Sequence, residues 1–360
     1  MSITYDEIHD TFNALKKTIA YIEERWGDIE LFLKGKSRFV FVGCGSSYSI
    51  AKSFAMLCNM GTGKPSAALA AGDIILHSER YNKAIDGAVV VFISRSGRTS
   101  ELLMALDALE SQGCDFEVAS LVCADDTPLG ARSGLVLSTP WAFDESVCQT
   151  RCVTNFYFTA AYVYAKIAGD QSLVGELQSL TQDGETYLTK AGALASDIAL
   201  EPWTHVVVLA DAELEGLAEE GSLVFKEVCQ LPSNYHHLLD VRHGPMVLVG
   251  EKTLVIAVID GSKKLETDLL MDLKNKAARI VAFCCGAEGL EVKAELDGID
   301  GIEATDGLDG IQAIGYGRPL SHITSGIPLI ILCQLTAYYK SKSTGADPDK
   351  PEGLDPWISL

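Results

Sequence analysis

Short apolar runs alternate with helix-compatible segments along most of the chain, and this alternation restricts the fold more than any other feature. In the first half the runs lie at Arg38–Val42, Ala88–Ile93, Glu117–Cys123 and Gly134–Leu137. Short apolar runs separated by helical stretches are typical of parallel strands with helices packed on both faces of the sheet. We therefore expect a doubly wound α/β domain in this half of the chain.

The alternation begins again after an acidic, helix-compatible stretch. Strands are expected at Trp203–Leu209, Leu254–Ile259 and Ile280–Cys284, with helices at 213–231, 265–276 and 328–339. The chain therefore predicts two doubly wound parallel-sheet domains in tandem, preceded by an N-terminal helical segment. The expected boundaries are 1–35 for that segment, 36–170 for the first domain, 171–200 for a linker, 201–345 for the second domain and 346–360 for a C-terminal tail.

The composition excludes several classes of function. A net charge of −20 disfavours nucleic acid and anionic membrane surfaces as partners. No apolar run reaches the roughly 18 residues of a membrane helix, and the first ten residues are polar and acidic rather than those of a signal peptide. The ten scattered cysteines, including Cys148, Cys152 and the pair Cys284–Cys285, lack the paired spacing of a zinc site. We expect a cytoplasmic protein with reduced thiols and no bound metal.

Two strand ends carry residues suited to an anion. The first strand runs into Gly43-Cys44-Gly45-Ser46-Ser47, where glycines let the backbone approach a ligand and the start of a helix offers N–H groups beside two hydroxyls. A Gly- and Ser-rich connector between strand and helix is also common without any ligand. This turn alone therefore leaves both interpretations open.

The second strand end favours the anion. The run at 89–93 is followed by Ser94-Arg95-Ser96-Gly97-Arg98-Thr99, which combines hydroxyl and guanidinium groups. Neighbouring parallel strands end at the same edge of a sheet, so both loops are expected to form one pocket for a compact dianion such as a sugar phosphate. The corresponding turn of the second half, Ala210–Glu213, is acidic and repels phosphate. We expect one phosphate pocket per chain, in the first domain.

These two loops resemble the phosphate-binding signatures of SIS (sugar isomerase) domains. The chain is similar over nearly its whole length to tandem-SIS enzymes: the isomerase half of glucosamine-6-phosphate synthase, amino-sugar-6-phosphate deaminases and ketose/aldose phosphate isomerases. The resemblance implies flavodoxin-like αβα sandwiches, no cofactor, and a homodimer with shared active sites. It implies phosphate- or sugar-binding roles for Gly45, Ser46, Ser47, Ser94, Arg95, Ser96, Thr99, Val147 and Gln149.

The catalytic residues are assigned through the same resemblance. By spacing alone, Glu227 is better explained as a surface carboxylate that pairs with a lysine. The family segment that matches 219–245 instead gives Glu227 the transfer of a proton between C1 and C2 of the sugar. It gives His243 the opening of the sugar ring, in the active site of the partner subunit. The tail has Pro356 where the synthase has a lysine, so a Schiff-base route is not expected.

Three functions remain open at this stage. The leading hypothesis is a phosphosugar isomerase that interconverts the aldose and ketose forms of a hexose or amino-hexose 6-phosphate through an enediol(ate). The first alternative is an amino-sugar-6-phosphate deaminase or a fructosamine-6-phosphate deglycase, which would share the same loops. The second is a sugar-phosphate sensor without catalysis, which would not need Glu227 and His243.

Overall fold

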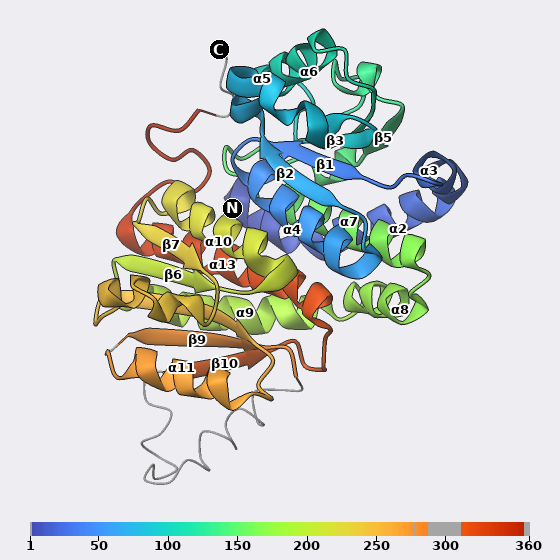
Figure 1. Cartoon of the computed structure of the whole chain (residues 1–360). Helices are drawn as coiled ribbons and strands as arrows, with labels where there is room; N and C mark the ends of the chain where they lie inside the picture. Colours follow the sequence, from blue (N-terminus) through green and yellow to red (C-terminus); the bar gives the residue numbers. More distant parts are fainter. Residues whose placement is uncertain (1, 277, 287–310, 356–360) are drawn as a thin grey trace. The chain divides into compact units, whose positions relative to one another are not determined.

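The computed structural model describes residues 2–276, 278–286 and 311–355 (Figure 1). They divide into two compact units, one formed by residues 2–182 with 353–355 and the other by the described residues of 183–352. Each unit contains a five-stranded sheet in which every pairing is parallel. The predicted α/β architecture with two parallel sheets is confirmed.

The first unit has the strand order β2-β1-β3-β4-β5, which is the order of flavodoxin-like sheets. Its strands are β1 (Phe39–Gly43), β2 (Ser66–Ala70), β3 (Ala88–Ser94), β4 (Phe116–Val122) and β5 (Leu135–Ser138). Its helices are α1 (Ile3–His9), α2 (Thr11–Glu24), α3 (Trp26–Leu33), α4 (Ser46–Thr62), α5 (Ala71–Ile85), α6 (Ser100–Ser111), α7 (Arg151–Ala168) and α8 (Gln171–Leu180). The sequence did not predict β2, a half-buried strand of small residues at the edge of the sheet.

The two faces of the first sheet are covered by different helices, because successive strand residues point to opposite sides. Val40 and Val42 pack in one apolar core with residues of α5 and α6. Phe39 and Phe41 instead line a cavity together with residues of α4 and α7. Helices therefore cover both faces of this sheet, and the connecting loops lie at its two edges, where the strands begin and end.

The N-terminal helical segment belongs to the first unit. The Thr18 hydroxyl on α2 donates to Oδ1 of Asn155 on α7 at 2.6 Å and accepts a hydrogen bond from the Trp141 indole at 2.9 Å. At the far end of α2, Glu23 pairs with Lys166 of α7 at 2.6 Å. These contacts fix the N-terminal helices on α7.

The second unit repeats the topology of the first. Its strands are β6 (His205–Leu209), β7 (Ser233–His236), β8 (Thr253–Ile259), β9 (Arg279–Cys284) and β10 (Ile311–Gly315), in the order β10-β9-β8-β6-β7. Numbered from its own first strand, this is again the order 2-1-3-4-5. Its helices are α9 (Gly184–Ala199), α10 (Glu215–Val228), α11 (Lys264–Lys274) and α13 (His322–Thr344). The sequence did not predict β7 and β10.

The stretch expected as a linker forms two packed helices. In the first unit, α8 lies against α7, whereas in the second unit α9 packs along α13. The buried Tyr187 of α9 donates a hydrogen bond to the carbonyl oxygen of Pro328 in α13 at 2.7 Å. The sequence predicted that the last helix begins at Pro328, but α13 begins six residues earlier, at His322. Ser321 caps this start, because its hydroxyl accepts a hydrogen bond from the Thr324 amide. Across the described residues, no helix has both the length and the apolar character needed to cross a bilayer.

Candidate functional site

The turn after β1 is tightly built around glycine. A Cβ atom at Gly43 would lie 2.4 Å from the carbonyl carbon of Ser47, so only glycine allows the turn to approach the start of α4 this closely. Gly45 precedes the helix with φ of +52°, a conformation that side chains rarely adopt. Ser46 and Ser47 form the first turn of α4 and are both buried. The predicted strand–turn–helix arrangement is confirmed.

The loop after β3, residues 94–99, is held by hydrogen bonds to its own hydroxyl groups. The Ser94 hydroxyl lies 2.9 Å from that of Thr99 and accepts a hydrogen bond from the Gly97 amide at 3.0 Å. The Ser96 hydroxyl accepts from the Arg98 amide at 3.2 Å. These hydroxyls lie in a small space at the start of α6, and hydroxyl groups beside a helix start are suited to an anion.

The two loops lie on neighbouring strands. β1 pairs directly with β3, in a register that places Val42 beside Phe92, so Gly43 and Ser94 end adjacent strands at the carboxyl edge. The strand order reverses between β1 and β3, and open α/β sheets bind ligands in the crevice at such a switch point. The predicted juxtaposition of the two loops is confirmed.

Arg95 turns inward instead of facing the crevice. Its side chain is buried, and Nη1 donates to the carbonyl oxygens of Asp144, Ser146 and Val147 at 3.3, 2.8 and 3.3 Å. The guanidinium also lies 5.7 Å from the centre of the Phe143 ring. These contacts tie the loop after β3 to the loop between β5 and α7, so they give Arg95 a role in holding that loop. Arg98 of the loop after β3 is exposed instead, and its Nη2 donates to the carbonyl oxygen of Asp126 at 3.2 Å.

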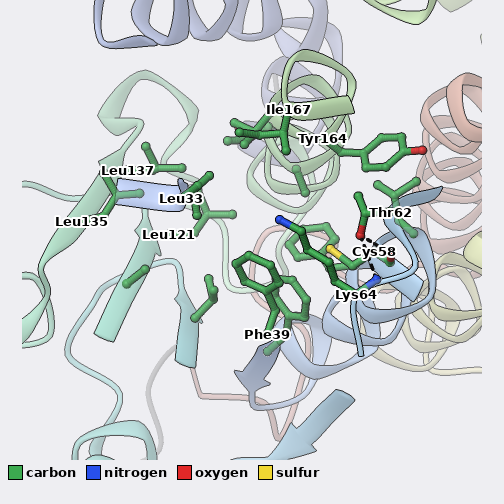
Figure 2. Close-up of a pocket in the computed structure, with 18 of the residues that line it drawn as sticks. Leu33, Phe39, Cys58, Thr62, Lys64, Leu121, Leu135, Leu137, Tyr164 and Ile167 are labelled. Atoms are coloured by element: carbon green, nitrogen blue, oxygen red, sulfur yellow. Dashed lines mark hydrogen bonds between the residues drawn. The ribbon is translucent and has the colours of Figure 1, made fainter. Parts of the chain in front are cut away.

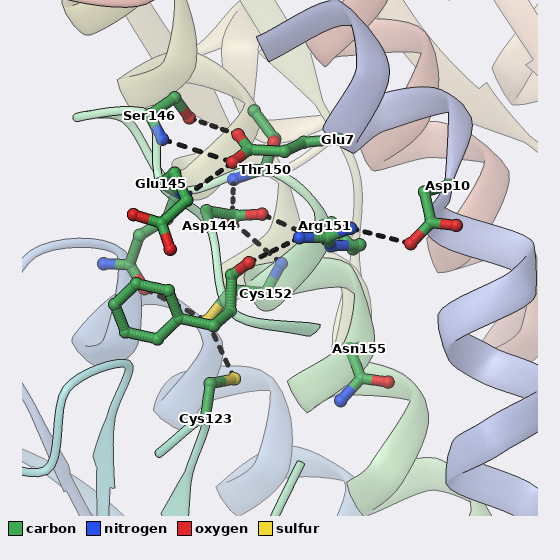
Figure 3. Close-up of polar contacts among 12 residues, drawn as sticks. Glu7, Asp10, Cys123, Asp144, Glu145, Ser146, Thr150, Arg151, Cys152 and Asn155 are labelled. Atoms are coloured by element: carbon green, nitrogen blue, oxygen red, sulfur yellow. Dashed lines mark hydrogen bonds and ion pairs between the residues drawn. The ribbon is translucent and has the colours of Figure 1, made fainter. Parts of the chain in front are cut away.

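The loop between β5 and α7, residues 139–150, carries Val147 and Gln149, both half-buried. Asp144 fixes the end of this loop that leads into α7, since its Oδ2 accepts hydrogen bonds from the amides of Thr150 at 2.8 Å and Cys152 at 2.9 Å (Figure 3). Asp144 thus satisfies two amides at the start of α7. Burial raises the pKa of Asp144 to about 7, and the nearby charge of Glu7 acts in the same direction.

Residues from the N-terminal helices complete this cluster, and sequence reasoning missed them. Glu7 of α1 accepts hydrogen bonds from the amides of Glu145 and Ser146 and from the Ser146 hydroxyl (Figure 3). Arg151 donates to Asp10 at 2.7 Å and also contacts the carbonyl oxygen of Phe143. The available signal was weak, because a glutamate in an amphipathic helix gives no indication of a partner about 140 positions later in the chain.

Glu227 lies in the last turn of α10 in the second unit, with a half-buried side chain. Leu217, Gly221, Val224 and Val228 are buried, because their three- and four-residue spacing places them on one face of the helix. Lys226 precedes Glu227 and donates to the Ser222 hydroxyl at 2.9 Å, and burial lowers the pKa of this lysine. The carboxylate of Glu227 therefore stands beside a buried helix face with a cation next to it.

His243 follows a short turn at Asp240–Arg242 and is exposed. Within the described part of the chain, its imidazole forms no hydrogen bond or ion pair, whereas Arg242 beside it is held by Asp272 at 2.7 Å. An exposed histidine on a fixed turn is available to a ligand or to another subunit. His236 and His237 lie nearer the end of β6, where His237 approaches Asp211 at 3.5 Å.

The C-terminal tail passes α10 within the second unit. Gln230, just beyond the end of α10, donates through Nε2 to the carbonyl oxygen of Glu352 at 2.6 Å. The tail is thus held close to the helix end that carries Glu227. Pro356, where the synthase has its lysine, lies outside the described residues.

A separate cavity of about 120 Å³ lies in the first unit, between the sheet and helices α3, α4 and α7 (Figure 2). Its walls include Phe39 at the start of β1, Leu135 at the start of β5 and Ile167 near the end of α7, which places it at the amino edge of the sheet. The lining is mostly apolar, and Lys64 is the cation that reaches it, over the ring of Phe39. An apolar cavity lacks the donors that a sugar phosphate requires.

The cysteines do not form a metal site or a reactive centre in the described residues. No group of three or more histidine, cysteine, aspartate or glutamate side chains suited to a metal ion occurs there. Burial, assisted by the charge of Glu101, raises the pKa of Cys44 in the turn after β1 to about 11. Cys44 is therefore a neutral thiol at pH 7.

Comparison with known proteins decides the family of this region. Residues 32–163 match the family model of the SIS domain, which spans both loops and the β5–α7 connection. The first unit contains a SIS domain. Its two loops are the segments in which the sequence resembled SIS signatures, and this resemblance is confirmed.

The wider similarity extends beyond the SIS domain. The chain is 25% identical, over 98% of its length, to glutamine–fructose-6-phosphate aminotransferase [isomerizing] of Sulfolobus acidocaldarius, and it covers 56% of that protein. The chain thus spans little more than half the length of this relative. It is 23% identical to D-galactosamine-6-phosphate deaminase of Escherichia coli, over 73% of this chain and 71% of that one.

A solved structure shows the same fold over the whole chain. The crystal structure of glucosamine-6-phosphate deaminase from Thermotoga maritima superposes with a TM-score of 0.80 at 23% identity, and each chain is covered completely. At this level of identity the match establishes the fold alone.

Proposed function

We propose that this chain is a phosphosugar isomerase of the SIS type that acts in the cytoplasm as a homodimer. It moves a proton between C1 and C2 of a hexose or amino-hexose 6-phosphate through an enediol(ate), without a cofactor. The observation that supports this most strongly is the pair of hydroxyl-rich loops at the switch point of a SIS domain. We further propose that the second unit, with the same strand order, is a second SIS-type domain that provides the catalytic groups.

In this proposal the first unit binds the phosphate. The hydroxyls of Ser46, Ser94, Ser96 and Thr99 donate hydrogen bonds to the phosphate oxygens. Backbone amides of both loops also donate, and Gly45 and Ser47 contact the phosphate at the start of α4. The Ser94 and Thr99 hydroxyls, which now bond to each other, each have a rotatable proton to turn toward the phosphate. Val147 and Gln149 line the sugar, while Arg95 acts indirectly by fixing their loop.

The chemistry is assigned to two residues of the second unit. His243, from the partner subunit, protonates the ring oxygen and takes the proton of the anomeric hydroxyl, which opens the ring. Glu227 then takes the proton from C2 and returns it to C1, while a proton moves between the two oxygens. Each proton taken is given back, so the reaction needs no cofactor and no net acid or base.

Substrate turnover tests the proposal directly. The purified chain is incubated with fructose, tagatose, glucosamine and galactosamine 6-phosphates and with a fructosamine 6-phosphate, and the products are scored as aldose or ketose, ammonia, or released amine. Glu227→Gln should lower turnover by about 10²–10⁴-fold and abolish exchange of the C2 proton with deuterated solvent. An enzyme that still exchanges this proton at the wild-type rate would rule out Glu227 as the base. A chain that binds none of these sugars would overturn the whole proposal.

Mixing experiments test the shared active site. Glu227→Gln and His243→Ala variants are each expected to be inactive. When they exchange subunits, one of the two sites in a mixed dimer regains both groups, so up to about a quarter of the wild-type activity should return. An active monomer would exclude this arrangement.

The second candidate is an amino-sugar-6-phosphate deaminase. Relatives over most of the chain carry that name. The same proton transfer next to an amino group at C2 gives an imine, which water hydrolyses to a ketose and ammonia. Release of ammonia from glucosamine or galactosamine 6-phosphate, without aldose–ketose conversion of fructose 6-phosphate, would favour it. Tight binding of a sugar phosphate with no product of any kind would instead indicate a sensor.

A further inference from the structure

The loop that carries Val147 and Gln149 is held by charged side chains from two distant parts of the first unit. From one side, Arg95 donates to three of its carbonyl oxygens, the shortest bond being 2.8 Å to Ser146. From the other side, Glu7 accepts from the amides of Glu145 and Ser146 and from the Ser146 hydroxyl (Figure 3). Ser146 is therefore bound through both its amide and its carbonyl group, directly before Val147.

Glu7 is suited to hold the loop because its carboxylate is almost completely withdrawn from solvent. The residue is only 5% exposed, and a buried carboxylate requires hydrogen-bond donors in place of water. Among the residues that the structure describes, the donors to its two oxygens all come from Glu145 and Ser146 of the loop. The position of Glu145 and Ser146 is therefore linked to the hydrogen bonds of Glu7, because a shift of these two residues would break those bonds.

The helix that presents Glu7 is itself fixed close to the same loop. Asp10, one turn further along the chain, pairs with Arg151 at the start of α7, and Arg151 also contacts Phe143 and Asp144 of the loop. The amino-terminal residues therefore connect to both ends of the segment 143–151. A connection to one end alone would leave the middle of the loop free to shift.

We propose that Glu7 is a positioning residue for the sugar-phosphate site: it holds Ser146, and with it Val147 and Gln149, at the edge of the SIS domain. This inference rests on the proposed function, because it takes Val147 and Gln149 to line the sugar. Glu7 does not touch the reacting atoms, so its loss should weaken substrate binding more than the chemical step.

The test compares Glu7→Gln with Asp6→Asn, a change of the same kind at the exposed neighbouring position of α1. Glutamine is neutral and keeps a single acceptor oxygen, so the bonds from the two loop amides lose their charge assistance. Its NH2 group replaces the acceptor of the Ser146 hydroxyl, which must then donate to the carbonyl oxygen of Cys148 instead. Hydrogen exchange at the amides of 145 and 146 should accelerate by about tenfold or more in Glu7→Gln and stay unchanged in Asp6→Asn. With the sugar phosphate that the wild type turns over, KM should rise about tenfold while kcat stays within about threefold.

The possible outcomes separate the two proposals. A merely structural role would lower the fraction of folded enzyme, and hence kcat, without raising KM. Faster exchange at 145 and 146 with an unchanged KM would overturn the positioning role and leave the proposed function intact. If Glu7→Gln does not fold, Ser146→Ala, which removes one of the donors, must raise KM in the same direction. A wild type that binds no sugar phosphate would overturn both proposals.

Discussion

Replacing Gly43 by alanine tests how closely the phosphate turn must pack against α4. The added Cβ would lie 2.4 Å from the carbonyl carbon of Ser47 and 2.5 Å from the amide nitrogen of Tyr48, closer than the 3.0 Å below which real Cβ atoms essentially never approach. Both contacts are with backbone, so no side chain can rotate out of the way. The first turn of α4 must therefore move by roughly 1 Å, a shift of the size that misaligns a binding group.

Two effects follow from that movement. Overpacking that shifts backbone destabilises a protein by about 1–3 kcal/mol, partly offset by the smaller conformational entropy of the unfolded alanine chain. The hydroxyl of Ser46 and the helix amides also move away from the phosphate, and each charge-assisted hydrogen bond lost costs about 1.5–3 kcal/mol. We expect the dissociation constant for a sugar phosphate to rise by about 10–100-fold and the midpoint of thermal unfolding to fall by about 2–8 °C.

Calorimetric titration with a sugar phosphate and thermal unfolding measure these two effects on the same sample. Gly72→Ala is the matched control, because a Cβ there meets nothing within 4 Å and the residue lies in α5 without a positive φ. It should leave affinity unchanged and stabilise the protein by up to about 1 kcal/mol. If Gly43→Ala binds within twofold of the wild type and unfolds at the same temperature, close packing of this turn does not set the position of the phosphate site.

Further expectations concern three other groups. Burial raises the pKa of Asp144 to about 7, so between about pH 4 and 7 the folded protein holds a proton that the unfolded chain has released. The free energy of unfolding should therefore fall as the pH rises from about 4 to 7, by at most about 1.4 kcal/mol per pH unit. Urea titrations across this range should show a flatter slope for Asp144→Asn; an equal slope would contradict the assignment. Cys44, whose pKa burial raises to about 11, should react slowly with iodoacetamide at pH 7, and Cys44→Ser should keep kcat within about twofold; rapid inactivation through Cys44 would refute this. Ser96→Ala should raise KM about tenfold, whereas Ser111→Ala at the exposed end of α6 should not; equal KM values would remove Ser96 from the phosphate site.

The buried strands and the two hydroxyl-rich loops at their carboxyl ends could be predicted because their signals are local. β1, β3, β6, β8 and β9 are almost continuous apolar runs, since strands covered on both faces need no polar alternation, whereas β4 carries Glu117 and Ser120 among its apolar residues. The missing strands are those without such a run. β7 reads Ser-Asn-Tyr-His and lies at a sheet edge, where one side of the strand is unpaired and polar residues are tolerated.

Other features depend on contacts between distant positions, which no local pattern reveals. α9 reads as an acidic linker, but several of its small residues are buried, the helix packs along α13, and Tyr187 donates to the carbonyl oxygen of Pro328. Arg95 sits in a loop rich in anion-binding groups, yet three carbonyls of a loop about 50 residues later in the chain turn it inward. Glu7 acquires its role through the same loop. These assignments required the three-dimensional arrangement within each unit.

The apolar pocket between the sheet and helices α3, α4 and α7 gives the first unit a further route to stabilisation. A small nonpolar molecule that fits this pocket binds only while the strands and helices that form its walls are in place. Because it binds the folded chain and not the unfolded one, such a molecule raises the free energy of unfolding, and with it the midpoint of thermal unfolding. The pocket lies at the amino edge of the sheet, so its occupant does not compete with a ligand of the loops at the carboxyl edge.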